Sequence, residues 1–376
     1  MLVSYLGIAQ TIKTGVLVIG NGSNAIGASI QSAVSGVKTI LLLPDPGFVL
    51  SPPGNPSSGI DAELQKRMIS GNASAAAVVK IWTDTLKNLT VIRGTPWIRI
   101  KRSGGNWHVN LVGGKSIKAE VMVNADASGK LISELKLVKV PLQWRTFGYQ
   151  DFMYRTSVAT GHTLNNVSAN ILPLSTLLIP TQENLVSLNS DHESIASGQA
   201  AGATAAYGVF FKKKTSAVDL KAVQGELINY KLSLVPYADV NPADSNWKAI
   251  QQIGLSGFIK AEIKEGTAYF RPDLPVSRLE IAEPIKSYYY KSQIWFDDHK
   301  DPQMTLAATL KMIAYVGGLS LENTTTEVRK NWRSAYHFGH DFDADRVISR
   351  REFAVLVSQY LKPFNMTIDK SGKVLR

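Results

Sequence analysis

The fold is most constrained by a strand, a glycine-rich turn, a helix of small residues and a second strand within the first 45 residues. Apolar runs at 15–19 and 39–43 predict two buried strands. The turn between them has a G-x-G-x-x-A pattern, in which the first glycine allows a tight turn and the second lets the backbone approach a phosphate. An ordinary strand–turn–helix connection could share this pattern. The residues that we assign to a phosphate-binding turn are Gly20, Gly22, Ser23, Asn24 and Ala25.

The acidic side chain that would bind the ribose of a dinucleotide is displaced in this sequence. It normally ends the second strand, about 20 residues after the first glycine. Leu43 and Pro44 stand there, and Asp45 follows them. We therefore take Asp45 as the candidate for this role. If it does not serve, the affinity for the adenosine half of a dinucleotide falls.

Composition excludes several classes of chemistry. The chain has no cysteine, so disulfides, thiolate metal sites and cysteine nucleophiles are excluded. There are 41 basic and 30 acidic residues, and residues 1–234 hold 22 and 13 of them. An anionic cofactor fits this excess, and so does ordinary surface charge. We expect no nucleic acid, no metal and no transmembrane span, because basic runs with aromatics, ligand clusters and long apolar stretches are missing.

Two more small-residue motifs follow in an order known from one family. Alternating strands between 91 and 124 predict a β-meander that ends at Asp126-Ala127-Ser128-Gly129. A strand then ends at Ser190-Asp191 and leads into a glycine and alanine helix near 198–206. With the first turn, these motifs resemble the FAD-dependent oxidoreductases, in particular the secreted bacterial type often labelled xanthan-lyase-like. Ser190 departs from the family pattern, which has glycine there.

This resemblance implies an α/β fold and noncovalent FAD, since attachment through sulfur is excluded. We expect a three-layer FAD/NAD(P)-binding Rossmann-like domain with a β-meander at 11–234, and a smaller, mostly helical domain at 235–376. Residues 140–182 would form the substrate-facing part of the first domain. The further cofactor contacts that the resemblance implies are Ala127, Gly129, Asp191, Gly198, Gln199 and Ala200.

Candidates for catalysis and substrate binding are weaker. Arg145 and Tyr149 lie in an aromatic and polar segment, together with Arg155 and, further on, His162. They suit a polar or anionic substrate, for example a sugar, but each also fits a partly buried strand surface. His192 follows Asp191 directly, where it could move a proton near a flavin or cap the next helix.

The carboxyl-terminal part contains a duplication. The block at 270–282 recurs at 342–354 with a constant offset of 72 residues. Each block contains a Ser-x-x-Glu helix start, which predicts a capping box. The blocks resemble S-layer homology repeats, which bind cell-wall polysaccharide, and the resemblance implies glycan contacts for Arg278 and Arg350. A structural appendage is the alternative, because only two units are clear.

Taken together, the sequence predicts an FAD-dependent oxidoreductase that transfers a hydride from an unidentified substrate, for example a carbohydrate-related one. The alternative is a binding or structural protein at the cell surface that kept the fold and lost the cofactor. Residues 1–10 are apolar and small, as in the remnant of a signal peptide. They favour a periplasmic or secreted protein, with a cytoplasmic one as the alternative.

Overall fold

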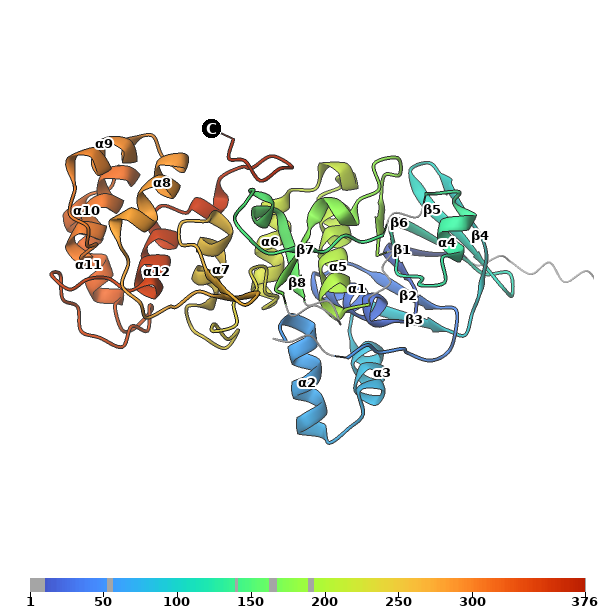
Figure 1. Cartoon of the computed structure of the whole chain (residues 1–376). Coiled ribbons are helices and arrows are strands. Elements are labelled where there is room, and N and C mark those ends of the chain that lie inside the picture. Colours follow the sequence, from blue (N-terminus) through green and yellow to red (C-terminus); the bar gives the residue numbers. More distant parts are fainter. Residues whose placement is uncertain (1–10, 53–56, 139–140, 162–167, 189–192, 376) are drawn as a thin grey trace, which may run out of the picture. The chain divides into compact units, whose positions relative to one another are not determined.

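The computed structural model describes residues 11–52, 57–138, 141–161, 168–188 and 193–375 (Figure 1). The chain forms two compact units. Unit 1 contains Met1–Arg145, Val158–Thr163 and Leu172–Leu232, and unit 2 contains Thr146–Ser157, Leu164–Ile171 and Ser233–Arg376. The segment at 146–157, which we predicted to face the substrate, is thus part of unit 2.

Unit 1 is built on a sheet of seven strands. β1 (Thr11–Ile19) lies between β2 (Thr39–Leu43) and β6 (Ser116–Asn124) and is parallel to both strands. β10 (Leu185–Ser187) is parallel to β6. Two antiparallel strands form the predicted meander beside β6. The strands are β3 (Leu89–Arg93), β2 (Thr39–Leu43), β1 (Thr11–Ile19), β6 (Ser116–Asn124), β5 (Asn106–Leu111) and β4 (Trp97–Ser103), with β10 (Leu185–Ser187) on β6.

Both faces of this sheet are covered, which explains the unbroken apolar runs of its strands. Leu17 and Ile19 belong to a cluster with Trp97 and Trp107 of the meander. A second cluster of buried residues, which includes Ile26 and Ile30, lies between the helices and packs them against one another. The helices of unit 1 are α1 (Ser23–Val34), α2 (Gly59–Gly71), α3 (Ala75–Thr85), α4 (Lys130–Glu134), α5 (Ile195–Phe210) and α6 (Leu220–Asn229). This arrangement confirms the predicted α/β class and its Rossmann-like, three-layer form.

Unit 2 is mostly helical, with one short hairpin. The elements after Ser233 are α7 (Trp247–Ser256), β11 (Glu262–Lys264), β12 (Thr267–Tyr269), α8 (Arg278–Tyr288), α9 (Lys291–Asp298), α10 (Leu306–Gly317), α11 (Leu321–Asn331), α12 (Arg350–Tyr360) and η4 (Pro363–Asn365). The shorter elements elsewhere in the chain are β7 (Arg145–Thr146), η1 (Met153–Thr156), β8 (Ser157–Gly161), β9 (Asn170–Pro173), η2 (Leu174–Leu177) and η3 (Thr215–Ala217). Among the described helices, none combines the length and apolar character needed to cross a bilayer.

Three helix starts in unit 2 are joined by backbone bridges. The segments at 275–277, 303–305 and 347–349 each pair with the other two. Each ends in a hydroxyl residue that accepts a hydrogen bond from the backbone N–H three residues further on, and these caps are Ser277, Thr305 and Ser349. The first and third segments belong to the duplicated blocks. The sequence motif of the blocks does not identify the segment at 303–305, because its helix starts Thr-Leu-Ala-Ala and lacks the arginine and glutamate of the blocks.

Candidate functional site

The turn between β1 and α1 has the conformation that its first glycine was predicted to allow. Gly20 has φ +147°, and a Cβ there would collide with the carbonyl oxygen of Ala125. The backbone N–H of Gly20 donates to Leu42 O at 3.1 Å, and that of Ala125 donates to Ile19 O at 2.9 Å. The turn is therefore locked between the ends of β2 and β6, where only glycine fits.

The amino terminus of α1 carries a carboxylate. Gly22 is the N-cap of this helix and has no side chain to satisfy the free N–H groups. The carboxylate of Glu193 lies against Gly22, in the space that a Cβ would fill, beside the backbone N–H groups of Ser23 and Asn24. Burial raises the pKa of this carboxyl above its ordinary range, although these two N–H groups oppose the shift. The N–H groups at this turn thus already have an anion beside them, and it comes from the protein.

The side chains at the start of α1 contact protein. Asn24 is 1% exposed, and its Oδ1 accepts from Ser197 Oγ at 2.7 Å and from the backbone N–H of Ser194 at 3.2 Å. Ser23 Oγ accepts from the backbone N–H of Ser51 at 2.8 Å. Ala25 is fully buried. In this region it is therefore the backbone that is suited to bind a ligand.

The small residues of α5 admit another helix. A Cβ on Gly198 would collide with Asn24 O of α1, and α1 and α5 lie side by side in Figure 1. Ala200 is fully buried. Gln199 is also buried, where its Oε1 accepts from the backbone N–H of Ile60 and its Nε2 donates to Gln31, both at 2.9 Å. These three predicted cofactor residues thus build the contact between helices.

The other predicted cofactor residues have varied surroundings. Leu43 is fully buried at the end of β2, and Asp45 is exposed. Ala127 is exposed, and Gly129 has φ +74° in a turn that the Asp126 carboxylate holds by accepting from the backbone N–H of Ser128 at 3.0 Å. Asp191 and His192 lie outside the described residues, as does His162.

The candidate catalytic residues Arg145 and Tyr149 belong to different units. Arg145 is an exposed residue of β7 in unit 1. Tyr149 belongs to unit 2, where its hydroxyl accepts a hydrogen bond from the backbone N–H of Ala261 at 2.8 Å. Burial raises the pKa of Tyr149 well above its ordinary range. At neutral pH this hydroxyl is protonated and supports the backbone of unit 2.

The two repeat arginines bind their own unit. Arg278 donates from Nε to His299 O at 2.7 Å and from Nη2 to Phe296 O at 2.6 Å. Arg350 donates from Nη1 to a backbone carbonyl and from Nη2 to Glu280 Oε1 at 2.5 Å, so that it links the two duplicated blocks. Burial raises the pKa of Glu280 despite this ion pair. Both guanidinium groups therefore tie segments of unit 2 together.

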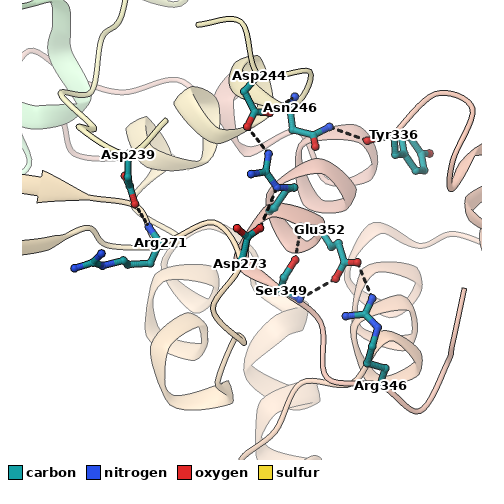
Figure 2. Close-up of polar contacts among 10 residues, drawn as sticks. Asp239, Asp244, Asn246, Arg271, Asp273, Tyr336, Arg346, Ser349 and Glu352 are labelled. Atoms are coloured by element: carbon teal, nitrogen blue, oxygen red, sulfur yellow. Dashed lines mark hydrogen bonds and ion pairs between the residues drawn. The ribbon is translucent and has the colours of Figure 1, made fainter. Parts of the chain in front are cut away.

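A polar cavity of about 510 Å³ in unit 2 is lined by Asn246, Arg346 and Glu352, among other residues. Asn246, which is 5% exposed, donates from Nδ2 to Tyr336 O at 2.9 Å, and its Oδ1 is buried with no partner among the described residues. Arg346 pairs with the buried Glu352 at 2.6 Å, while its Nε is also buried and unpartnered within the described part of the chain. Figure 2 shows both side chains and the Ser349–Glu352 capping box. No local sequence signal marks Asn246 or Arg346, because their positions depend on contacts across unit 2.

The topology and the glycine turn define a Rossmann-like unit with an anion-binding helix terminus. No protein-family model and no curated protein matches the sequence. Solved structures with partial similarity include GidA of Aquifex aeolicus, at 15% identity over 30% of this chain and 24% of that chain, with a TM-score of 0.23. Thioredoxin reductase of T. acidophilum is similar at 16% identity over 30% and 34% of the two chains, with a TM-score of 0.21.

The anhydrotetracycline hydroxylase OxyS of Streptomyces rimosus is similar at 11% identity over 36% of this chain and 35% of that chain, with a TM-score of 0.27. This chain therefore spans a quarter to about a third of the length of these three proteins. Similarity this partial adds no argument on function, which has to come from the site itself.

Proposed function

We propose that unit 1 binds FAD noncovalently and that the chain is an FAD-dependent oxidoreductase. The observation that carries this proposal is the anion at the start of α1. The Glu193 carboxylate fills the space beside Gly22, next to the backbone N–H groups of Ser23 and Asn24. It lies at the end of a turn that only glycine permits at position 20. A pyrophosphate uses the same kind of donors at a helix amino terminus. The Glu193 carboxylate is therefore a stand-in that supports the fit of this turn to a diphosphate.

In this proposal the residues of the chain bind and orient the cofactor. The turn at Gly20 and Gly22 lets the backbone approach the diphosphate, and the α1 terminus stabilises its negative charge. Asp45 is the acidic side chain nearest in sequence to the end of β2, and Leu43 leaves the adenosine half without a buried acid. When bound, FAD would supply the acceptor for a hydride from the substrate. A carbohydrate-related substrate, the xanthan-lyase-like type and a place outside the cytoplasm stay predictions.

The test is a titration of the purified chain with FAD, followed by flavin fluorescence and by the visible spectrum. We expect saturable binding by the wild-type chain. Gly22→Val should abolish it, because the side chain would fill the space where the diphosphate has to lie. The matched control is Gly71→Val, which changes an exposed glycine at the end of α2, where a Cβ would make only an ordinary contact with Ala73 Cβ at 3.9 Å. Absence of binding by the wild-type chain would refute the proposal, and so would equal binding by the Gly22→Val variant.

If FAD binds, reduction of the flavin identifies the substrate class. Candidate sugars and sugar acids are added to the FAD-loaded chain without oxygen, and bleaching of the flavin band marks an electron donor. This experiment keeps cofactor binding and substrate choice apart. A chain that binds FAD but that no member of the panel reduces would contradict the carbohydrate-related substrate and leave the cofactor proposal standing.

A second proposal concerns glycan binding by unit 2, and it rests on the polar cavity. Two residues that line the cavity have a buried polar atom without a partner among the described residues: Asn246 has the acceptor Oδ1, and Arg346 has the donor Nε. A sugar hydroxyl can donate to the first and accept from the second. We therefore assign the proposed contacts to Asn246 and Arg346, because Arg278 and Arg350 do not line the cavity and donate hydrogen bonds to groups of unit 2.

A pull-down on cell-wall glycan tests this second proposal. Asn246→Ala should lower the retained fraction, because it removes the free acceptor from the cavity. Asn323→Ala is the control, since Asn323 is an exposed residue of α11 that does not line the cavity. Retention of the Asn246 variant at the wild-type level would contradict this site.

A further inference from the structure

Glu193 is held at the start of α1 by the residues that follow it in the chain. The next residue, Ser194, is the N-cap of α5, and its backbone N–H donates to Asn24 Oδ1 at 3.2 Å. One turn later Gly198 packs on the backbone of Asn24. The backbone on the carboxyl-terminal side of Glu193 is thus fixed against α1. The tight contact of the two helices therefore brings this carboxylate to the helix terminus.

The carboxylate is also the charge that complements this helix end. The first turn of α1 contains no acidic residue, and its N-cap is a glycine without a side-chain hydrogen bond. A negative charge near a helix amino terminus is stabilised by the helix dipole and by the free N–H groups. The fit is incomplete, because Oε2 is buried and has no hydrogen-bond partner among the described residues. The contact stabilises Glu193 less than a fully bonded carboxylate.

We propose that Glu193 is a built-in competitor for the diphosphate-binding end of α1, which a dinucleotide has to displace before it binds. The inference rests on the proposed function of this turn. Both anions need the N–H groups of Ser23 and Asn24, and the Glu193 carboxylate lies in the space beside Gly22 that the diphosphate requires. Two negative charges at one helix terminus repel each other strongly in a partly buried site. In the chain without its ligand, the Glu193 carboxylate therefore occupies the amino terminus of α1.

Because of this competition, the observed affinity for FAD equals the intrinsic affinity multiplied by the fraction of chains in which the terminus is free. In this proposal the Glu193 carboxylate leaves the terminus by rotation of its side chain, because the backbone that follows it is held by α5. Removal of the carboxylate should then raise the affinity for FAD about tenfold or more, a change of about 1.4 kcal/mol. A residue that only capped α1 would behave differently, since its removal would lower stability and leave the affinity unchanged.

The experiment compares the full-length wild-type chain with Glu193→Ala, Glu193→Gln and the control Glu63→Gln. Glu63 is an exposed residue of α2 that pairs with Arg67. Flavin fluorescence gives the dissociation constant for FAD, and thermal unfolding with and without inorganic pyrophosphate reports on the terminus alone. We expect tighter FAD binding and a larger stabilisation by pyrophosphate in both Glu193 variants. The glutamine variant keeps an acceptor for the N–H groups, so it isolates the effect of charge and serves if the alanine variant does not fold.

The outcomes separate the inference from the proposed function. Equal FAD affinity in the wild-type chain and the Glu193 variants overturns the inference and leaves the FAD proposal standing. Stabilisation of the Glu193 variants by pyrophosphate, without FAD binding by any chain, supports the inference and overturns the FAD proposal. If the Glu193 variants fold and bind neither ligand, both are wrong.

Discussion

The contact between α1 and α5 makes Gly198→Ala a sharp test of what the glycines of α5 do. A Cβ at Gly198 would lie 2.9 Å from the carbonyl carbon of Asn24 and 3.0 Å from the backbone nitrogen of Ala28, and closer still to Asn24 O. Ordinary contact begins near 3.4 Å. The contact with the carbonyl carbon of Asn24 is about half an ångström shorter than this limit, so α1 would have to move by at least that distance. All three atoms belong to the backbone of α1, so no side chain can yield in their place.

The expected cost follows from two opposing terms. Overpacking of a tight interior contact costs about 1–3 kcal/mol, and a contact with backbone atoms lies at the upper end of this range. Alanine gains about 1 kcal/mol over glycine in helix propensity. The net destabilisation of the α1–α5 pair is thus about 2 kcal/mol. It corresponds to about 30-fold faster hydrogen exchange in peptides that open with this pair.

Hydrogen–deuterium exchange is the suitable assay, because it resolves peptides of α1 and α5 from those of unit 2. The control Gly71→Ala introduces the same methyl group at an exposed helix end and should leave exchange unchanged. Gly202→Ala should resemble Gly198→Ala, since its Cβ would meet Ala28 Cα at 2.9 Å. The double variant should cost less than the sum, because α1 has already moved. Exchange at the wild-type rate in Gly198→Ala, with lowered FAD affinity, would refute the packing argument and favour direct contact with the flavin.

Three further predictions concern single side chains. Ser349→Ala should lower the stability of unit 2 by about 1 kcal/mol, because Ser349 caps α12 together with Glu352; an unchanged urea midpoint would contradict this. Tyr149→Phe should cost about 1 kcal/mol by leaving the Ala261 N–H without its partner, while FAD affinity stays at the wild-type value; a loss of affinity would return Tyr149 to the site. Burial raises the pKa of Glu193 from its ordinary value of 4.5, so its contribution to stability is present below that pH and is lost as the pH rises through the folded-state pKa. Urea unfolding across the acidic range should therefore show the wild-type chain losing stability relative to Glu193→Gln as the pH rises, and a constant difference would contradict the assigned burial.

The turns, helix caps and strands could be predicted from the sequence, because each depends on interactions between residues close together in the chain. The turn at Gly20 follows from a glycine pattern between two apolar runs, and the caps at Ser277 and Ser349 follow from a four-residue motif. The predicted capping box forms at Ser349, whereas at Ser277 the side-chain cap forms without the reciprocal bond of the glutamate. The α/β class follows from the same runs, since strands covered on both faces carry unbroken apolar sequences. In each case the residues that decide the structure are neighbours in the sequence.

Contacts between distant segments could not be predicted in this way. Thr305 caps a third helix start without the arginine and glutamate that mark the other two, so only the backbone bridges reveal it. Arg350 resembles a glycan ligand in its motif, yet its hydrogen bonds are to Phe270 O and Glu280 within unit 2. Glu193 belongs to no motif, and its role depends on where α5 meets α1. The motifs identify Arg350 but not Thr305 or Glu193, and the contacts of all three residues depend on packing between distant segments.

The same packing explains why the helix terminus selects anions by its backbone. Neither the first nor the last turn of α1 carries a charged side chain, although residues 1–234 hold 22 basic and 13 acidic residues. The basic excess is therefore not placed on α1, and the attraction for a negative group comes from the N–H groups and the helix dipole. Such an attraction does not distinguish a carboxylate from a phosphate by charge alone. The number of donors that each can engage must decide between them, and a diphosphate offers more acceptor oxygens than Glu193, whose Oε2 has no partner among the described residues.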